Sequence, residues 1–87
     1  MVQEYLEREC VLLMSEIITT TDQVGAIVRR TRRSQGLTQA ELAGACGTSV
    51  RFIVEIEKGK PTCQVGKVLK VLRMLGVIVT IAEQRTE

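Results

Sequence analysis

The stretch that decides the fold is TQAELAGACGTSVRFIVEIEKGK, which spans Thr38–Lys60. Thr38 and Glu41 have the spacing of a capping box, in which the threonine hydroxyl accepts from the backbone N–H three residues later and the glutamate reaches back to the threonine N–H. Gly47 ends this first helix after two turns, because glycine tolerates the left-handed conformation that closes many helices. A second short helix then runs to about Glu57. The stretch therefore predicts two short helices joined by a tight turn.

The turn and the facing sides of these two helices meet several demands at once. Either Thr48 or Ser49 caps the second helix. Ala43 is small at the position where the second helix crosses closely, and Gly47 takes the turn. The inward positions are filled by Leu42, Ala43, Ile53 and Ile56. An ordinary helical hairpin does not require this combination, so the pattern predicts a helix-turn-helix.

A longer helix is predicted before this pair, over residues 22–35. Its start is capped by Thr20 together with Gln23, or by Thr21 and Asp22, and the glycine after residue 35 ends it. Its side chains at helical spacing are Val24, Ile27, Val28 and Thr31, with arginines on the remaining positions. This helix is the first of the helical domain, and the two short helices joined by the tight turn follow it.

A fourth helix is predicted after the turn Lys58–Pro61, because glycine there tolerates positive φ and the proline blocks helix continuation. Thr62 is available to cap this helix, and Gly76 closes it. The predicted apolar stripe consists of Val65, Val68, Leu69, Leu72 and Leu75, with Lys67, Lys70 and Arg73 outside it.

The C-terminal segment Val77–Ile81 predicts a short strand. Four of its five residues are apolar and strongly β-forming: Val77, Ile78, Val79 and Ile81, with Thr80 between them. A lone strand would leave its backbone groups unpaired. It therefore needs a partner, which is either Ile17–Thr21 of the same chain, itself β-branched, or the same strand of a second copy across a two-fold axis. Both alternatives favour a dimer or a bound partner.

The N-terminal segment differs from the rest in pattern and charge. Leu6, Cys10, Leu13 and Ile17 fall on one side of a helix. The chain is therefore divided into an amphipathic extension at 1–21, a helical domain at 22–76, and a dimerisation strand with its tail at 77–87. The glutamates at 4, 7, 9 and 16 outweigh one arginine in the extension, whereas residues 22–60 carry seven cations against four anions. The basic centre either faces phosphates or is a solvated helix face.

Composition excludes several classes of protein. The 87 residues are 45% hydrophobic and 2% aromatic, so Leu, Ile, Val and Ala build the core. The chain has no histidine, and Cys10, Cys46 and Cys63 are widely spaced, which argues against zinc, a disulfide scaffold and an enzyme. No cofactor is expected. No signal-peptide pattern or membrane-length apolar run is seen, so the expected protein is soluble and cytoplasmic.

The pattern T-Q-A-E-L-A-x-x-x-G-T-x-x-x-x-I-x-x-I-E-x-G-K resembles the Cro/repressor (Xre-type) DNA-binding family over residues 22–75. The resemblance implies a lambda-repressor-like, mainly α domain whose third helix enters the DNA major groove. Here Val77–Ile81 replaces the family's fifth helix. A core of four helices ending in a short strand is similar to HipB-type antitoxins, which pair C-terminal strands across a dimer, repress their own operon and bind a HipA-like kinase toxin.

The resemblance also implies roles for individual side chains. The residues that face DNA bases would be Ser49, Val50, Arg51 and Glu55. Arg51 can donate two hydrogen bonds to guanine, and Val50 can touch a thymine methyl. Glu55 either accepts from a cytosine amine or pairs with Arg51, and Ser49 contacts a base or a phosphate.

The remaining implied roles concern the DNA backbone and the protein's own packing. The candidate phosphate contacts are Gln39, Thr48, Lys58 and Lys60. Arg32 and Glu57 match a partly buried ion pair that joins the first and third helices of the domain. Phe52 either packs on the following helix or reaches a partner.

The sequence thus predicts a homodimeric repressor of double-stranded operator DNA in a bacterial cytoplasm, associated with the nucleoid when bound. The resemblance implies that it is the antitoxin of a HipBA-like system and that it regulates its own operon. The alternative is a stand-alone phage-type or regulatory repressor with no toxin partner.

Overall fold

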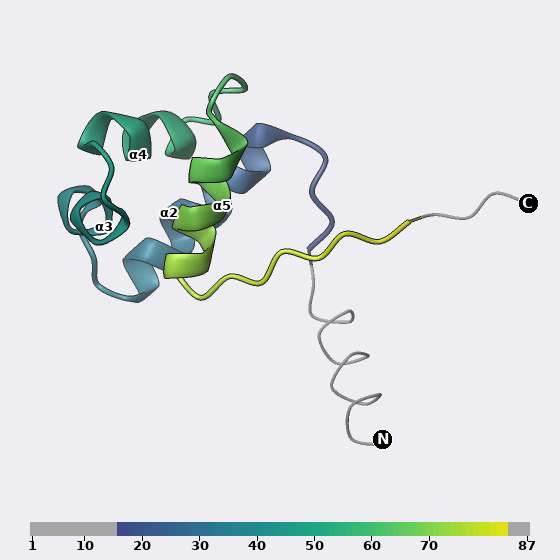
Figure 1. The fold of residues 1–87 in the computed structure, drawn as a ribbon. Helices are drawn as coiled ribbons and strands as arrows, with labels where there is room; N and C mark the ends of the chain where they lie inside the picture. The colour runs from purple at the N-terminus through teal and green to yellow at the C-terminus, as the bar shows by residue number, and fades with distance from the viewer. Residues whose placement is uncertain (1–15, 84–87) are drawn as a thin grey trace, which may run out of the picture.

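The computed structural model describes residues 16–83 of the chain. In this range the chain forms four helices: α2 (Thr21–Ser34), α3 (Gln39–Cys46), α4 (Val50–Glu57) and α5 (Val65–Met74). Figure 1 shows α4 above α3, with α5 crossing in front of α2 beside them. The predicted four-helix, mainly α core is confirmed. The amphipathic helix predicted from Leu6 onward lies outside the described residues, apart from Ile17, which is exposed and not helical.

Two of the predicted helix starts form as capping boxes. Thr20 accepts from the N–H of Gln23, whose side chain accepts in turn from the N–H of Thr20, so the first of the two alternatives for α2 is the observed one. Thr38 and Glu41 exchange the same pair of hydrogen bonds at the start of α3, each at 3.0 Å. These bonds satisfy N–H groups that have no partner within the helix.

The cap of α4 resolves the choice between two hydroxyl residues. Gly47 has φ +66°, and the N–H of Thr48 bonds back to the carbonyl of Ala43 at 3.0 Å. Thr48 therefore completes the end of α3, as expected after a left-handed glycine. Ser49 is the first residue free to cap α4, and its hydroxyl accepts from the N–H of Phe52 at 3.1 Å. Of the two predicted alternatives, the one that places the cap of α4 at Thr48 is therefore wrong.

The start and the buried side of α5 also differ from prediction. Thr62 does not cap this helix, because residues 61–63 turn once more and α5 begins after Gln64 without a side-chain cap. Val65 is 71% exposed and Leu69 is exposed, whereas Val71 is fully buried. The line that faces the core is 68, 71, 72 and 75, of which 68 is half-buried and the others buried; it has helical spacing but is rotated from the predicted stripe. The sequence carries two apolar lines on α5, and the core takes one of them.

The core joins all four helices. Its buried members are Val28, Leu42, Ala43, Cys46, Ile53, Ile56, Val71, Leu72 and Leu75. The inward positions predicted for α3 and α4 are thus confirmed. Gly25 lets α2 approach α4, because a Cβ there would collide with the backbone of Ile56 and Glu57. Cys46 is core filler, and its burial raises the pKa of its thiol although Lys70 opposes this, so the thiol stays neutral.

Residues 77–83 leave α5 as an extended run (Figure 1). Within residues 16–83 no segment is assigned as a strand, and no backbone hydrogen bond joins residues 17–21 to residues 77–81. The pairing within one chain therefore does not form, and the strand stays a prediction. None of the helices in the described range is long and apolar enough to cross a membrane.

Candidate DNA-binding surface

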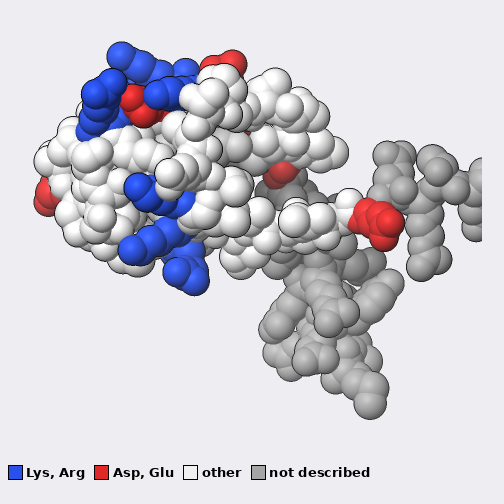
Figure 2. All heavy atoms as spheres, turned by 45° about the horizontal axis from the view of Figure 1, so that its top comes forward, with Lys and Arg blue, Asp and Glu red and all other residues white. Residues whose placement is uncertain are grey.

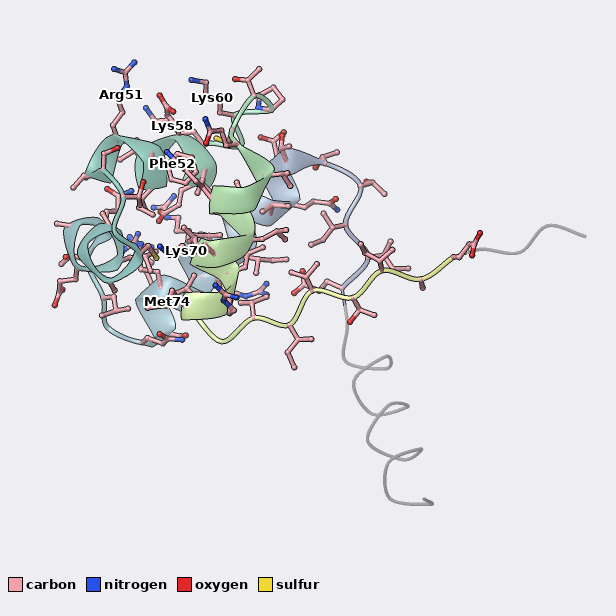
Figure 3. All side chains as sticks on the ribbon, in the orientation of Figure 1. Arg51, Phe52, Lys58, Lys60, Lys70 and Met74 are labelled. Atoms are coloured by element: carbon pink, nitrogen blue, oxygen red, sulfur yellow. The ribbon has the colours of Figure 1, made fainter. Side chains whose placement is uncertain are left out.

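Helix α4 presents two different sides. Ile53 and Ile56 are buried against α2 and α3 and hold the helix in place. Val50 and Arg51 lie in its first turn on the outer side, where the arginine side chain is 87% exposed. In Figure 3, Arg51 points away from the helical body. A helix fixed on one side and free on the other can enter a groove without losing its own packing.

The predicted base contacts are all on or beside this outer side. Ser49 caps the helix, and Glu55 follows Arg51 by one turn. The Nε of Arg51 lies 3.2 Å from Glu55 Oε1, and the Nζ of Lys60 lies 3.4 Å from the same oxygen. Burial alone would raise the pKa of Glu55, but Lys60 and Arg51 together lower it. Glu55 is thus ionised and held between two cations, so its intramolecular role is the one that the structure displays.

The four residues predicted to contact phosphates differ in exposure: two are exposed and two are half-buried. Lys58 and Lys60 are exposed in the turn after α4, and Figure 3 shows them projecting from the same side of the molecule as Arg51. Figure 2 shows basic side chains gathered there around an acidic group. Gln39 begins α3 but is half-buried, and its Nε2 donates to Glu57 Oε1 at 3.3 Å. Thr48 is half-buried at the end of α3.

A buried ion pair lies beneath this surface. Arg32 Nε is 2.8 Å from Glu57 Oε2 and its Nη2 is 3.0 Å from Oε1, while its Nη1 donates to the carbonyl of Leu37. The side chains are 10% and 5% exposed. Hydrogen bonding to Glu57 raises the pKa of Arg32 against the opposing effect of burial. This pair ties α2 to the end of α4 and, through Glu57, holds the side chain of Gln39.

Phe52 packs on α5 rather than standing free, as the first of its two predicted roles requires. It is half-buried against the core, and the Nζ of Lys67 lies 5.8 Å from its ring centroid. A cation over an aromatic face at this distance is attractive. Phe52 is therefore part of the support for α4.

Arg29 and Arg33 are not among the individual contacts predicted from the sequence, which offered only that the basic centre containing them faces phosphates. They lie one helical turn apart on α2 and line a hollow together with Gln39 and Lys58. Their spacing of four residues places them on one side of the helix, which was the available signal. Which other helix lies on that side is a property of the fold alone.

Comparisons with known proteins agree with this geometry. A family model described as "Helix-turn-helix domain" matches residues 23–83. The HTH-type transcriptional regulator y4mF of Sinorhizobium fredii (strain NBRC 101917 / NGR234) is 52% identical over 68 residues, which cover 78% of this chain and 90% of that protein. The chain therefore belongs to the helix-turn-helix family of transcriptional regulators.

Solved structures share the fold at lower identity. A chain of the "HipA-HipB-O2-O3 complex" matches with a TM-score of 0.73 and 22% identity, covering 82% of this chain and all of that one. A chain of the "HipB-O4 20mer complex" matches with a TM-score of 0.72 and the same identity and coverage. The expected resemblance to Xre-type proteins is confirmed, and HipB is among the structures whose fold the chain shares.

Proposed function

We propose that the protein is a dimeric repressor that binds operator DNA by placing α4 in the major groove. The observation that carries the proposal is the division of α4 into a buried side at Ile53 and Ile56 and a free side at Val50 and Arg51. An α-helix fits the major groove, where each base pair presents its own pattern of donors and acceptors. The helix-turn-helix family supports the same use of this helix.

Within this proposal the side chains divide into two groups. Arg51 selects sequence by donating to guanine, and Val50 and Ser49 lie close enough on the same turn to assist it. Lys58 and Lys60 contact phosphates and fix the register of the protein without selecting sequence. Gln39 and Thr48, at the two ends of α3, also contact phosphates of the DNA backbone.

The dimer is supported by apolar side chains that one chain leaves uncovered. Ile78, Val79 and Ile81 are exposed, the last to 94%, and Val65 and Leu69 of α5 are exposed as well. An exposed apolar patch of this kind is typical of an interaction site. In the proposed dimer, Val77–Ile81 of two copies pair and cover part of this apolar surface. Binding of two half-sites one DNA turn apart requires the two α4 helices to lie about 34 Å apart.

Sedimentation of the full chain tests the dimer. The expected result is a mass of two chains, and Ile78→Asp is expected to produce a single-chain mass. Ala26→Asp places the same charge at an exposed position of α2, outside the proposed strand, and serves as the matched comparison that is expected to stay dimeric. A single-chain mass for the unchanged protein at the concentrations that bind DNA would contradict the dimer.

Binding to the DNA upstream of its own gene tests the operator proposal. Arg51→Ala is expected to lose about 1–3 kcal/mol of preference for the operator over scrambled DNA, the usual worth of a bidentate base contact. The fold is expected to be unchanged, because the side chain is exposed. Arg30→Ala, which removes an exposed arginine of α2 paired with Glu16, is expected to keep the preference. Full selectivity in Arg51→Ala would contradict the role of α4.

The biological use that we propose is that of a HipB-like antitoxin that represses its own operon and binds a kinase toxin. The support is the shared fold with HipB in a complex that contains HipA. Co-purification with the product of the adjacent gene tests it. A protein that binds its operator but recruits no neighbour would instead be a stand-alone repressor.

A further inference from the structure

A shallow hollow of about 340 Å³ lies beside the outer side of α4, where the end of that helix meets α2 and the start of α3. Its floor is the buried pair of Arg32 and Glu57. The other side chains that line it are Arg29 and Arg33 from α2, Gln39 from α3, Val54 from α4, and Lys58 directly after α4. Three helices thus converge on one small surface depression.

The charge of this hollow is positive and uncompensated. Glu57 is the one carboxylate that lines it, and Arg32 already neutralises Glu57 with two hydrogen bonds. Among residues 16–83, no carboxylate lies within ion-pair distance of Arg29, Arg33 or Lys58. Their positive charges are therefore available to an anion from outside.

The hollow also continues the surface of the recognition helix. Val54 follows the exposed Val50 by one turn, and Lys58 follows Val54 by another, so the outer side of α4 leads directly into the depression. Helix α3 begins at Gln39, which lines the hollow, so the partial positive charge of a helix start lies beside it. A DNA strand that borders the groove occupied by α4 would pass this point.

We propose that the hollow holds one backbone phosphate of the operator, gripped by Arg29 and Arg33. The inference rests on the proposed operator binding and extends the contact from α3 and α4 to α2. A guanidinium suits this task because its planar fork of donors matches two phosphate oxygens. The role of the floor is electrostatic, since Arg32 keeps the carboxylate of Glu57 from repelling the phosphate.

The experiment compares the full chain with its Arg29→Gln/Arg33→Gln variant on operator duplexes in which one phosphate at a time is replaced by neutral methylphosphonate. The unchanged protein is expected to lose affinity at each contacted phosphate. In the variant, one flanking position in each half-site is expected to lose its effect, while the other positions keep theirs.

Salt dependence provides a second measurement of the same contact. The slope of log affinity against log salt is expected to fall by about 0.9 for each bound protomer that loses one phosphate contact. The affinity lost between 50 and 200 mM salt is then roughly 3.5-fold smaller per protomer. Arg30→Gln is the matched control, because this neighbouring exposed arginine of α2 is paired with Glu16 and does not line the hollow.

Two results would separate the possible failures. If the double variant keeps the slope and every methylphosphonate effect of the unchanged protein, the hollow binds no phosphate and the inference is overturned while operator binding stands. If the unchanged protein shows no preference for any operator, the proposed function fails first and the inference fails with it. Both arginines are exposed, so an unchanged melting temperature is expected and confirms that the variant is folded.

Discussion

Helix α4 carries two glutamates two residues apart, and their ion pairs differ in almost every physical respect. Glu57 is 5% exposed and receives two hydrogen bonds from Arg32, which is itself buried. Glu55 is 25% exposed and lies between Arg51 and Lys60 at longer distances, with both cations open to solvent. Two residues correspond to about 200° of rotation on a helix, so the two carboxylates face opposite sides.

The difference teaches how one short helix can be both a structural member and a binding surface. A buried pair with good geometry cannot lose one partner without leaving a charge in a dry environment. An exposed pair contributes little to stability because water replaces each partner easily. The inner pair, Arg32 with Glu57, is therefore required for folding. The cations of the outer pair, Arg51 and Lys60, can exchange Glu55 for DNA.

The largest expected effect comes from breaking the inner pair. Glu57→Ala is expected to lower the free energy of unfolding by about 3–5 kcal/mol, because it leaves Arg32 buried without its partner. Urea unfolding at neutral pH measures this loss. DNA binding would fall with it, as a consequence of lost folding.

The matching change on the outer side is Glu55→Ala, which removes the same group two residues away. Its expected cost is much smaller than that of Glu57→Ala, because an exposed pair contributes little to stability. Equal losses from the two variants would show that the two sides of α4 are not energetically distinct.

The next effect concerns where α4 begins, since this sets which residues reach its outer side. Ser49→Ala is expected to cost about 1 kcal/mol, because the N–H of Phe52 loses its cap. Thr48→Ala is the control and is expected to cost less, because the bond of Thr48 to the carbonyl of Ala43 comes from its backbone. A larger loss from Thr48→Ala would place the cap one residue earlier than the structure does.

Much of the helical core could be predicted because its signals are local. The capping box of Thr38 and Glu41 and the left-handed Gly47 involve residues close in sequence, and both form as predicted. The choice between Thr48 and Ser49 could not be made in this way, since either hydroxyl fits a cap. It depends on how the preceding helix ends, which uses the backbone of Thr48.

The error on α5 has a tertiary origin, and the strand predicted at the C-terminal segment likewise depends on contacts outside that segment. Val65, Leu69 and Val71 are all apolar, so periodicity offers more than one stripe, and the packing of α5 on α3 selects the one that contains Val71. A strand at Val77–Ile81 needs a partner that no local pattern supplies. Likewise, the roles of Arg51 and Glu57 came from resemblance to a family, and the hollow at Arg29 and Arg33 requires three helices in place.

The smallest expected effect is on how stability depends on pH, and it tests the pairing of Glu55 with Arg51 and Lys60. The pKa of Glu55 is lowered in the folded protein, where Lys60 and Arg51 outweigh the effect of burial. A carboxyl whose folded pKa lies below its unfolded value of 4.5 contributes stability above about pH 4.5, and this contribution is lost as the pH falls through the folded pKa. Glu55→Gln removes the contribution at every pH. Its melting temperature is therefore expected to lie slightly below that of the unchanged protein at pH 7 and to converge with it as the pH falls below the folded pKa of Glu55.

The same substitution is expected to act in the opposite direction on DNA. Without Glu55, the cations of Arg51 and Lys60 no longer have an internal partner, and a negative charge that would face phosphates is gone. Operator affinity at pH 7 is expected to rise while stability falls slightly. Glu83→Gln, which removes one exposed carboxylate from the C-terminal segment, is expected to change neither. A Glu55→Gln variant with weaker binding would instead assign the carboxylate a direct contact with a base, and the outer pair would then be part of sequence recognition itself.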